Sequence, residues 1–308
     1  MKKVFIDGSA GTTGLRIFER LVGRDDVELL ILPEEKRKDS AARKEMLNKA
    51  DVVFLCLPDD AAREAAAMVD NPNTVVIDAS TAHRTLPDWA YGFPELSKGH
   101  EDKLLKSKRI ANPGCHASGF IALVYPLIEA GLLDKETLLT CHSITGYSGG
   151  GKKMIAEYES ADRNPLLDAP RQYGLTQQHK HLKEMKAITG LDNAPMFSPI
   201  VSDFYSGMTV TVPLFASQIK GSAEDIKTVY KAKYNGEIVR YQENADEGGF
   251  ISGAALSGKD SMVVTVAGND ERILLVACYD NLGKGASGAA IECMNLVIGA
   301  KRTKGLIL

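Results

Sequence analysis

Short runs of Val, Ile, Leu and Phe alternate with amphipathic segments along the first third of the chain. The apolar runs predict four buried strands, at residues 3–6, 27–32, 51–57 and 74–78. The intervening segments have polar faces and apolar positions at helical spacing, at residues 13–22, 40–49 and 59–69. Strands that alternate with helices form right-handed βαβ units whose parallel sheet is covered on both faces. This third of the chain therefore predicts a doubly wound, Rossmann-like α/β fold.

The pattern changes after Cys115. An apolar helix is predicted over residues 117–130, with Gly131 as its C-cap and Pro126 as a kink or an early end. Longer strand-like runs follow, at residues 138–145, 208–215, 262–267 and 273–279. Helical patterns are fewer here, at residues 223–234 and in the tail at 288–300. These features predict an α+β domain built on a mixed sheet.

This change of pattern predicts two tightly joined domains. We expect a dinucleotide-binding domain over residues 1–115 and a catalytic, substrate and dimerisation domain over residues 116–282. The C-terminal helix, within residues 283–308, is expected to pack back on the first domain.

Composition excludes several classes of protein. Hydrophobic residues make up 44% of the 308 residues and charged residues 25%, which excludes a disordered chain. The 37 basic and 40 acidic residues give a net charge of −3, so the basic excess of a nucleic-acid-binding protein is missing. The apolar run at the N-terminus is too short for a signal peptide, and no apolar run reaches the ~18 residues of a membrane span. We expect a cytoplasmic protein with no nucleic-acid or membrane partner.

The five cysteines are scattered and odd in number, and no two form a C-x-x-C pair. Neither a zinc site nor a disulfide framework is therefore predicted, and we expect no metal. Four of the cysteines lie in strand-like or helical apolar runs and are interpreted as core residues: Cys56, Cys141, Cys278 and Cys293.

A glycine-rich loop directly follows the first predicted strand and opens the first predicted helix. Its glycine spacing is G-x-x-G-x-x-G, and its residues are Gly8, Ser9, Ala10, Gly11, Thr12, Thr13 and Gly14. Glycines allow the backbone to approach a pyrophosphate, which then lies at the positive end of the helix dipole. The loop predicts dinucleotide binding.

The end of the second strand indicates which dinucleotide binds. An NAD site usually has an acidic residue there for the ribose 2′-hydroxyl. Here Glu34 and Glu35 are followed by Lys36 and Arg37, which can pair with a 2′-phosphate. We favour NADP over NAD, with a solvated loop of mixed charge as the alternative.

Cys115 follows a Pro-Gly turn and stands at the start of the apolar helix. Unpaired N–H groups and the helix dipole at such a position stabilise a thiolate, and the same N–H groups can form an oxyanion hole. A nucleophilic cysteine beside a nicotinamide indicates acyl-enzyme chemistry, in which hydride reduces a thioester to an aldehyde.

That cycle needs a proton donor. His179 and His181 are two residues apart, so in an extended chain they share a face. They precede a helical pattern that begins near Lys183. We expect one of them to be the acid/base; His116 and His142 are the alternatives.

Residues 146–153 form a second glycine-rich stretch, which includes Ser148 and Lys152. Repeated backbone N–H groups and a lysine suit a phosphate or a carboxylate, so this stretch predicts an anion cradle. It lacks the Walker spacing, which excludes an ATPase interpretation.

In the order of its motifs the chain resembles the short form of the N-acetyl-gamma-glutamyl-phosphate reductase family, essentially from end to end. The matching motifs lie at residues 8–14, 78–84, 91–96, 112–115, 179–181 and 280–286. Longer members carry an aromatic residue where this chain has Thr12-Thr13, and Asp-Phe where it has Ala82-His83. These departures concern the cofactor contacts and leave the nucleophile unchanged.

The resemblance implies NADPH-dependent reduction of N-acetyl-glutamyl-5-phosphate to the semialdehyde, with release of inorganic phosphate, in arginine biosynthesis. It implies Cys115 as the nucleophile and His179 or His181 as the acid/base. It further implies cofactor contacts at Ser80 and Asn281, and substrate contacts at Arg84, Asn112, Ser148 and Lys152. A homo-oligomer is expected.

Three alternatives remain open. Aspartate-semialdehyde dehydrogenase and aminoadipyl-phosphate reductase share this mechanism, and the histidine motif favours the glutamyl enzyme over the aspartyl one. The aminoadipyl substrate differs by one methylene, a difference that a pocket distinguishes by only ~1–3 kcal/mol. A non-catalytic NADP-binding sensor would explain the glycine loop, but it would need neither Cys115 nor the histidine pair.

Overall fold

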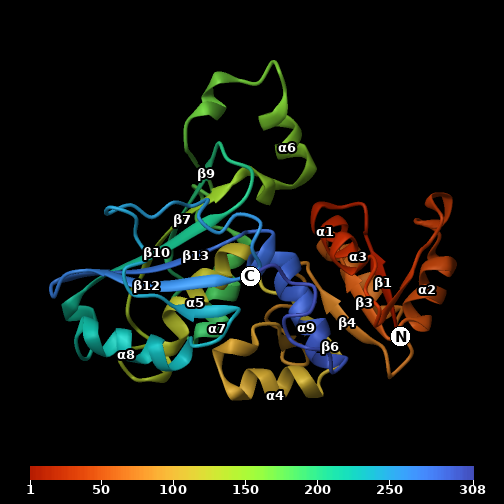
Figure 1. Cartoon of the computed structure of the whole chain (residues 1–308), viewed down its shortest axis with the longest axis horizontal. Helices are drawn as coiled ribbons and strands as arrows, with labels where there is room; N and C mark the ends of the chain where they lie inside the picture. Colours follow the sequence, from red (N-terminus) through yellow and green to blue (C-terminus); the bar gives the residue numbers. More distant parts are fainter. The chain divides into compact units, whose positions relative to one another are not determined.

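The computed structural model describes all 308 residues, which divide into two compact units. Unit 1 consists of Met1–Pro113 and Ala286–Leu306. Unit 2 consists of Gly114–Gly285 and Ile307–Leu308. Figure 1 shows both units, with most of their helices and strands labelled.

Unit 1 is a six-stranded parallel sheet in the order β2-β1-β3-β4-β6-β5. Its strands are β1 (Lys2–Asp7), β2 (Val27–Leu30), β3 (Val52–Leu55), β4 (Val75–Asp78), β5 (Ala90–Tyr91) and β6 (Arg109–Ala111). Its helices are α1 (Thr12–Leu21), α2 (Ser40–Lys49), α3 (Asp59–Ala67), α4 (Lys98–Lys106) and α9 (Gly288–Val297). The four strands and three helices expected in the first third are all present, within a few residues of the predicted bounds.

Both faces of the sheet are buried at its central strands, because these strands are continuously apolar and successive side chains point to opposite faces. In β3, Val52 and Phe54 pack in one core cluster with residues of α1, α4 and α9. Val53 and Leu55 point to the other face and pack with residues of α2 and α3. This two-sided burial is typical of a doubly wound parallel sheet and confirms the predicted class.

Unit 2 is a seven-stranded mixed sheet in the order β11-β12-β13-β10-β7-β9-β8. Its strands are β7 (Thr140–Gly146), β8 (Arg171–Gln172), β9 (Met196–Ser202), β10 (Met208–Phe215), β11 (Val239–Tyr241), β12 (Met262–Gly268) and β13 (Arg272–Tyr279). Its helices are α5 (Cys115–Glu129), α6 (Gly151–Glu159), α7 (Lys180–Thr189) and α8 (Ala223–Lys233). The β7·β9 and β11·β12 pairs are parallel and the others antiparallel, as expected for a mixed sheet.

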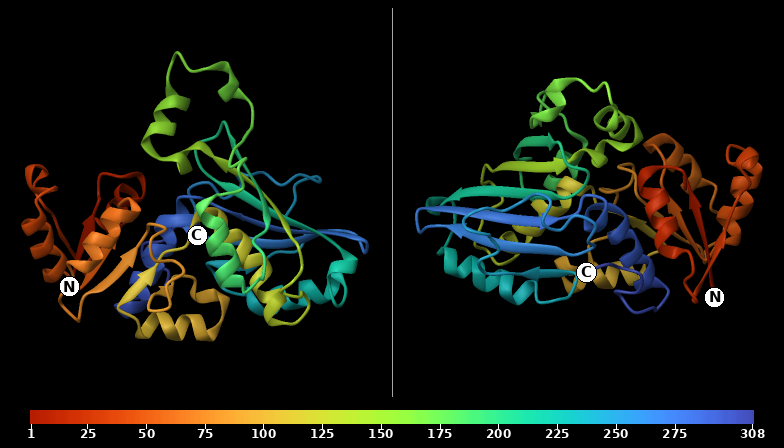
Figure 2. Two further views of the ribbon diagram at one scale, coloured as in Figure 1. Left: turned by 180° about the vertical axis from the view of Figure 1, so that it is seen from behind. Right: turned by 45° about the horizontal axis from the view of Figure 1, so that its top comes forward.

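Helices α5 and α8 pack on one face of the unit 2 sheet, and α7 packs against α5. The left view of Figure 2 shows the three helices on the same side of the sheet. Helix α6 belongs to a separate lobe, coloured green, that extends from the end of β7. In a small core at the base of this lobe, Tyr158 and Leu167 are buried together with Val201 of β9.

Pro126 neither ends nor interrupts α5, which continues to Glu129. A proline inside a helix removes one backbone hydrogen bond. Here Val124, Pro126 and Leu127 are buried, and their apolar packing outweighs that loss. Gly131 follows with a positive φ of 70°, as a helix C-terminus favours.

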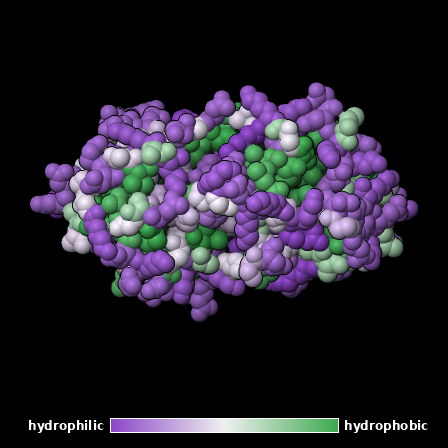
Figure 3. Space-filling view, turned by 90° about the horizontal axis from the view of Figure 1, so that it is seen from below, coloured by the Kyte–Doolittle hydropathy of each residue, from purple (hydrophilic) through white to green (hydrophobic).

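The face drawn in Figure 3 is mostly hydrophilic, and its hydrophobic residues lie in separate patches. None of the helices is both long and apolar enough to span a bilayer.

Candidate active site

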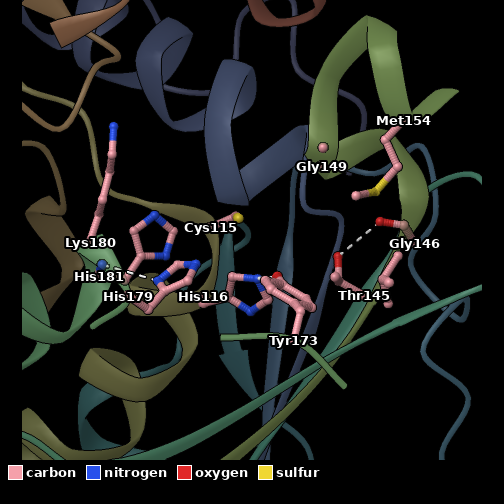
Figure 4. Close-up of a pocket in the computed structure, with 12 residues that line it drawn as sticks. Cys115, His116, Thr145, Gly146, Gly149, Met154, Tyr173, His179, Lys180 and His181 are labelled. Atoms are coloured by element: carbon pink, nitrogen blue, oxygen red, sulfur yellow. Dashed lines mark hydrogen bonds between the residues drawn. The ribbon is translucent and has the colours of Figure 1, made fainter. Parts of the chain in front are cut away.

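A cavity of about 270 Å³ in unit 2 brings together the residues that the sequence singled out for chemistry (Figure 4). Its lining consists of Cys115, His116, Thr145, Gly146, Gly149, Gly150, Met154, Tyr173, His179, Lys180, His181 and Val201. The expected nucleophile and both members of the histidine pair therefore share one cavity.

Cys115 is the first residue of α5, and Gly114 is its N-cap. No side chain caps this helix, and its first turn contains no acidic residue. The first intrahelical bond runs from the Ser118 N–H to the Gly114 carbonyl, so the amides before Ser118 have no partner within the helix. The half-buried thiol thus lies at the positive end of a fifteen-residue helix, which favours its thiolate form.

Two buried side chains from other elements hold this first turn. The Gly114 N–H donates to Glu184 Oε1 on α7, over 2.8 Å. The hydroxyl of Tyr279 on β13 donates to the Cys115 carbonyl at 2.5 Å and accepts from the Gly119 N–H at 2.9 Å. Sequence reasoning missed both residues. Glu184 could have been noticed in the sequence, because it is an acidic residue three positions after His181 on the buried face of the same helix.

The histidine pair differs from the expected arrangement. Its residues do not share a face of an extended chain, because α7 begins at Lys180 rather than near Lys183. His179 is the N-cap of this helix, and its Nδ1 accepts the His181 N–H over 3.2 Å. His181 lies in the first turn, and the two ring centroids are 4.7 Å apart. The start of a helix, not a strand, brings the two imidazoles together.

The cap defines the protonation of His179. An imidazole nitrogen that accepts a hydrogen bond carries no proton, so the neutral ring has its proton on Nε2. Burial, and then the charge of Lys180, lower the pKa of His179 below its ordinary value. Both effects keep this ring neutral.

His116 lies under the cavity and uses both of its ring nitrogens. Nδ1 is 2.6 Å from Ser143 Oγ, and Nε2 is 2.6 Å from the Tyr173 hydroxyl. Burial, with a smaller contribution from His179, lowers the pKa of His116 to about 3. His116 is therefore a neutral hydrogen-bonding residue that orients Tyr173. The sequence analysis did not identify Tyr173 as a residue of the cavity.

We expect His116 to make the stability of the protein depend on pH. Below about pH 6.5 the unfolded chain binds a proton that the folded protein takes up only near pH 3, so the free energy of unfolding decreases as pH falls through this window. One such proton contributes a slope of up to about 1.4 kcal/mol per pH unit. Urea unfolding at several pH values should show a shallower slope in His116→Gln. Equal slopes in the two proteins would contradict this account.

The other thiols differ from Cys115 in their surroundings. Burial raises the pKa of Cys56 to about 12, and it also raises the pKa of Cys141 and Cys278. Cys293 is fully buried in unit 1. None of these four lines the cavity.

The second glycine-rich stretch forms a short 3₁₀ turn, Tyr147–Gly150, followed by α6. Lys152 is exposed on α6 and does not line the cavity. Ser148 is buried and its hydroxyl accepts from Asn281 Nδ2 at 3.0 Å, while Asn281 Oδ1 accepts the Gly207 N–H at 2.8 Å. Ser148 and Asn281 thus link the turn to the loop after β13.

In unit 1 the glycine loop requires glycine at two positions, because it packs closely against the protein's own backbone. A Cβ at Gly8, whose φ is +89°, would lie 2.3 Å from the Cys56 carbonyl oxygen, and one at Gly14 would lie 2.4 Å from the Gly8 oxygen. Gly11 is the N-cap of α1, and no side chain caps this helix. Ser9, Thr12 and Thr13 are partly exposed and Ala10 is exposed. The loop therefore presents uncapped amides at a helix N-terminus, which fits a pyrophosphate.

Lys36 and Arg37 are exposed at the short 3₁₀ turn after β2. Arg43 on α2, which the sequence analysis missed, forms an ion pair of 2.9 Å with Asp7 at the end of β1. Its guanidinium ties α2 to the strand that leads into the glycine loop.

The remaining predicted contacts in unit 1 lie in a buried network. Ser80 Oγ donates to Asp78 at 2.7 Å, and Arg84 donates to the carbonyls of Asn112 and Ala79. The Asn112 amide donates to the Ala286 carbonyl at 3.0 Å, whereas its Oδ1 is buried without a hydrogen-bond partner. Ser80 and Arg84 thus support the ends of β4 and β6.

Two family descriptions match the chain. Residues 32–104 match the semialdehyde dehydrogenase NAD binding domain, and residues 115–281 match the semialdehyde dehydrogenase dimerisation domain. The chain is also similar in fold to aspartate semialdehyde dehydrogenase II of Vibrio cholerae in complex with ASA, with a TM-score of 0.72 at 17% identity over 97% of this chain and 98% of that one. The Candida albicans enzyme with NADP has a TM-score of 0.66 at 16% identity, over 97% and 99%.

Curated relatives are much closer in sequence. The N-acetyl-gamma-glutamyl-phosphate reductases of Sinorhizobium medicae and Rhizobium meliloti are both 47% identical, over 97% of this chain and 99% of each relative. That of Brucella ovis is 45% identical over 96% and 99%. This similarity confirms the resemblance seen in the motifs. The chain is an oxidoreductase with a NAD(P)-binding domain, and it belongs to the N-acetyl-gamma-glutamyl-phosphate reductase family.

Proposed function

We propose that the protein reduces N-acetyl-glutamyl-5-phosphate to N-acetyl-glutamate-5-semialdehyde with NADPH and releases inorganic phosphate, as a step of arginine biosynthesis. The observation that carries the proposal is Cys115 at the N-terminus of α5, in one cavity with His179 and His181. The names of relatives at 45–47% identity support the same substrate.

In the first half of the reaction, the Cys115 thiolate attacks the acyl carbon of the substrate. The carbon–oxygen bond to the phosphate breaks, phosphate leaves with the bonding electrons, and a thioester forms. Negative charge develops on the acyl oxygen during the attack, and the amides of the first turn of α5 can stabilise it. Glu184 and Tyr279 act as positioning residues, because they hold this turn from both sides.

In the second half, a thiohemiacetal is formed from the thioester; the glycine loop from Gly8 to Gly14 would hold NADPH, which would supply the hydride for this reduction. We assign the proton on the thiohemiacetal oxygen to His181. When the carbon–sulfur bond breaks, His181 takes this proton back, the aldehyde leaves and the Cys115 thiolate is restored. His179 is less suited to this role because its Nδ1 caps α7. Lys180 is the one lysine or arginine in the cavity lining and supplies positive charge for an anionic group of the substrate.

The preference for NADP is proposed to rest on Lys36 and Arg37. Replacing both with alanine should weaken NADP binding about 10- to 100-fold, because a charge-assisted contact contributes about 1.5–3 kcal/mol. NAD binding should remain nearly unchanged, since NAD has no 2′-phosphate. Titration calorimetry with both nucleotides measures the two effects.

Lys106 and Lys108 provide a matched control for this change of charge. Both are exposed in unit 1 and precede β6, whereas the glycine loop follows the carboxyl end of β1. Replacing them with alanine should leave NADP affinity unchanged. Equal affinities of the wild-type protein for NADP and NAD would show that Lys36 and Arg37 do not discriminate.

A spectrophotometric assay of the reverse reaction tests the function itself. Wild-type protein, N-acetyl-glutamate semialdehyde and phosphate should produce NADPH from NADP. Comparing kcat/KM for this aldehyde with those for the aminoadipyl and aspartyl semialdehydes distinguishes the related reactions. A protein that binds NADP but turns over none of these aldehydes would be a sensor rather than a reductase.

The uncovered face of the unit 2 sheet supports a homo-oligomer. Helices cover the opposite face, whereas Ile144, Leu274 and Phe215 are exposed on β7, β13 and β10. The family description of residues 115–281 as a dimerisation domain agrees with an assembly through this unit. Sedimentation equilibrium should give a mass of at least two chains.

A further inference from the structure

The cavity has two chemically different ends. Figure 4 shows His179, His181 and Lys180 on one side of Cys115, and Gly149 and Met154 on the other. The second side is completed by Gly150 and Val201, and it presents no charged side chain. Lys152, the lysine of the stretch predicted to be an anion cradle, is exposed and does not line the cavity, so a charged group of the substrate would lose its hydration there without gaining a charged side chain as a partner.

The proposed substrate has one uncharged, apolar terminus, the methyl group of its N-acetyl substituent. Its phosphate and its carboxylate both need donors or positive charge, which the Lys180 side of the cavity offers. We propose that the N-acyl group lies against Met154, and that Met154, supported by Gly150, determines the size of the acyl group accepted. This inference rests on the proposed function and extends it to the choice of acyl chain.

Gly150 and Met154 form a matched pair. The backbone of Gly150 has φ −80° and ψ 2°, a conformation open to any residue. A Cβ at this position would nevertheless lie 2.5 Å from the Met154 Sδ atom and 2.7 Å from its Cβ. The Met154 side chain therefore lies directly on the Cα of Gly150, and any side chain at residue 150 would displace it.

Other contacts hold Met154 in this position. It packs against the small core of the α6 lobe, which contains Tyr158, Leu167 and Val201. A methionine is otherwise one of the more adaptable side chains because it has several rotatable bonds. Because the Met154 side chain contacts this core on one side and Gly150 on the other, its position in the wall of the cavity is fixed.

The test compares N-acetyl- and N-butyryl-glutamate semialdehyde as substrates of the same protein preparation. The measured quantity is the ratio of kcat/KM for butyryl to that for acetyl, which does not depend on the fraction of active enzyme. Met154→Ala removes Cγ, Sδ and Cε and should raise this ratio about 10- to 200-fold, the range observed for one methylene in an apolar pocket. Met154→Leu, which nearly conserves volume, should keep the wild-type ratio.

Gly150→Ala supplies an independent arm. The added Cβ should push Met154 away from residue 150 and alter the acyl preference although the catalytic groups are unchanged. In Gly150→Ala/Met154→Ala the contacts of the added Cβ with Sδ and Cε are gone and only its contact with the Cβ at residue 154 remains, so the ratio should move back toward that of Met154→Ala. Non-additivity of this kind is expected for side chains in direct contact. Met196→Ala, at an exposed methionine outside the cavity, should have no effect on the ratio.

Binding provides a readout that does not need turnover. In the Cys115→Ser background, Met154→Ala should improve the affinity for N-butyryl-glutamate relative to N-acetyl-glutamate. If Met154→Ala left the butyryl-to-acetyl ratio unchanged in both assays while wild-type protein turned over the acetyl substrate normally, the role of Met154 would be refuted. The proposed function would still stand in that case. If wild-type protein turned over neither aldehyde, the proposed function would fail, and the acyl assignment with it.

Discussion

Cys115→Ser is expected to abolish turnover while the protein remains folded and still binds NADP. A serine at this position is a far weaker nucleophile, because the positive end of α5 stabilises a thiolate and a hydroxyl does not ionise near neutral pH. The rate should fall by on the order of 10⁴-fold or more, as for loss of other enzymatic nucleophiles. Steady-state kinetics and calorimetric titration with NADP measure the two properties separately.

Cys278→Ser makes the same atomic change at a buried thiol of β13 and should leave kcat within a few-fold of wild type. Iodoacetamide should label Cys115 before Cys56, since burial raises the pKa of Cys56 to about 12. Substrate should protect Cys115 from this labelling. Turnover of Cys115→Ser within tenfold of wild type would refute the nucleophile assignment.

His181→Asn is expected to lower kcat by about 10²–10⁴-fold, the usual contribution of a general acid/base. Its pH dependence near neutrality should disappear as well, because the group that carries the proton is gone. KM for the semialdehyde should change much less than kcat. A pH–rate profile of the variant beside that of wild type is the measurement.

His179 is the matched control for this substitution. His179→Asn keeps a residue that caps helices well, so α7 should remain intact and the main effect should be on KM. His179→Ala removes the cap and should cost about 0.5–2 kcal/mol of stability. If kcat collapsed in His179→Asn and not in His181→Asn, the two roles would have to be exchanged.

Local sequence patterns were sufficient for much of the fold. Strands β1 to β4 lie where short apolar runs predicted them and helices α1 to α3 lie in the polar-faced segments between those runs, because each of these patterns is confined to a few consecutive residues. Strands β5 and β8 contain two residues each and are too short for any such pattern. Helix α4 is polar and contains a glycine, so its helical pattern is weak.

The sequence by itself also determined that the proposed nucleophile and the proposed nucleotide loop each stand at the start of a helix. Both depend on a glycine turn followed by a helix, which is a feature of a few consecutive residues. For this reason Cys115 and the loop from Gly8 to Gly14 were recognised without tertiary information. The histidine motif was recognised too, but its conformation was wrong: the pair forms a helix start and not an extended segment.

Only the tertiary structure distinguished the two histidines and supplied their neighbours. Glu184 meets Gly114 across 70 positions of sequence, and Tyr279 meets Cys115 across 164. The Nδ1 bond of His179 depends on the exact start of α7, and the contact of Met154 with Gly150 depends on how α6 leaves its 3₁₀ turn. A sequence pattern reports which residues prefer a helix or a strand, whereas the proton position on an imidazole and the wall of a cavity depend on atoms that the folded chain brings within a few ångströms.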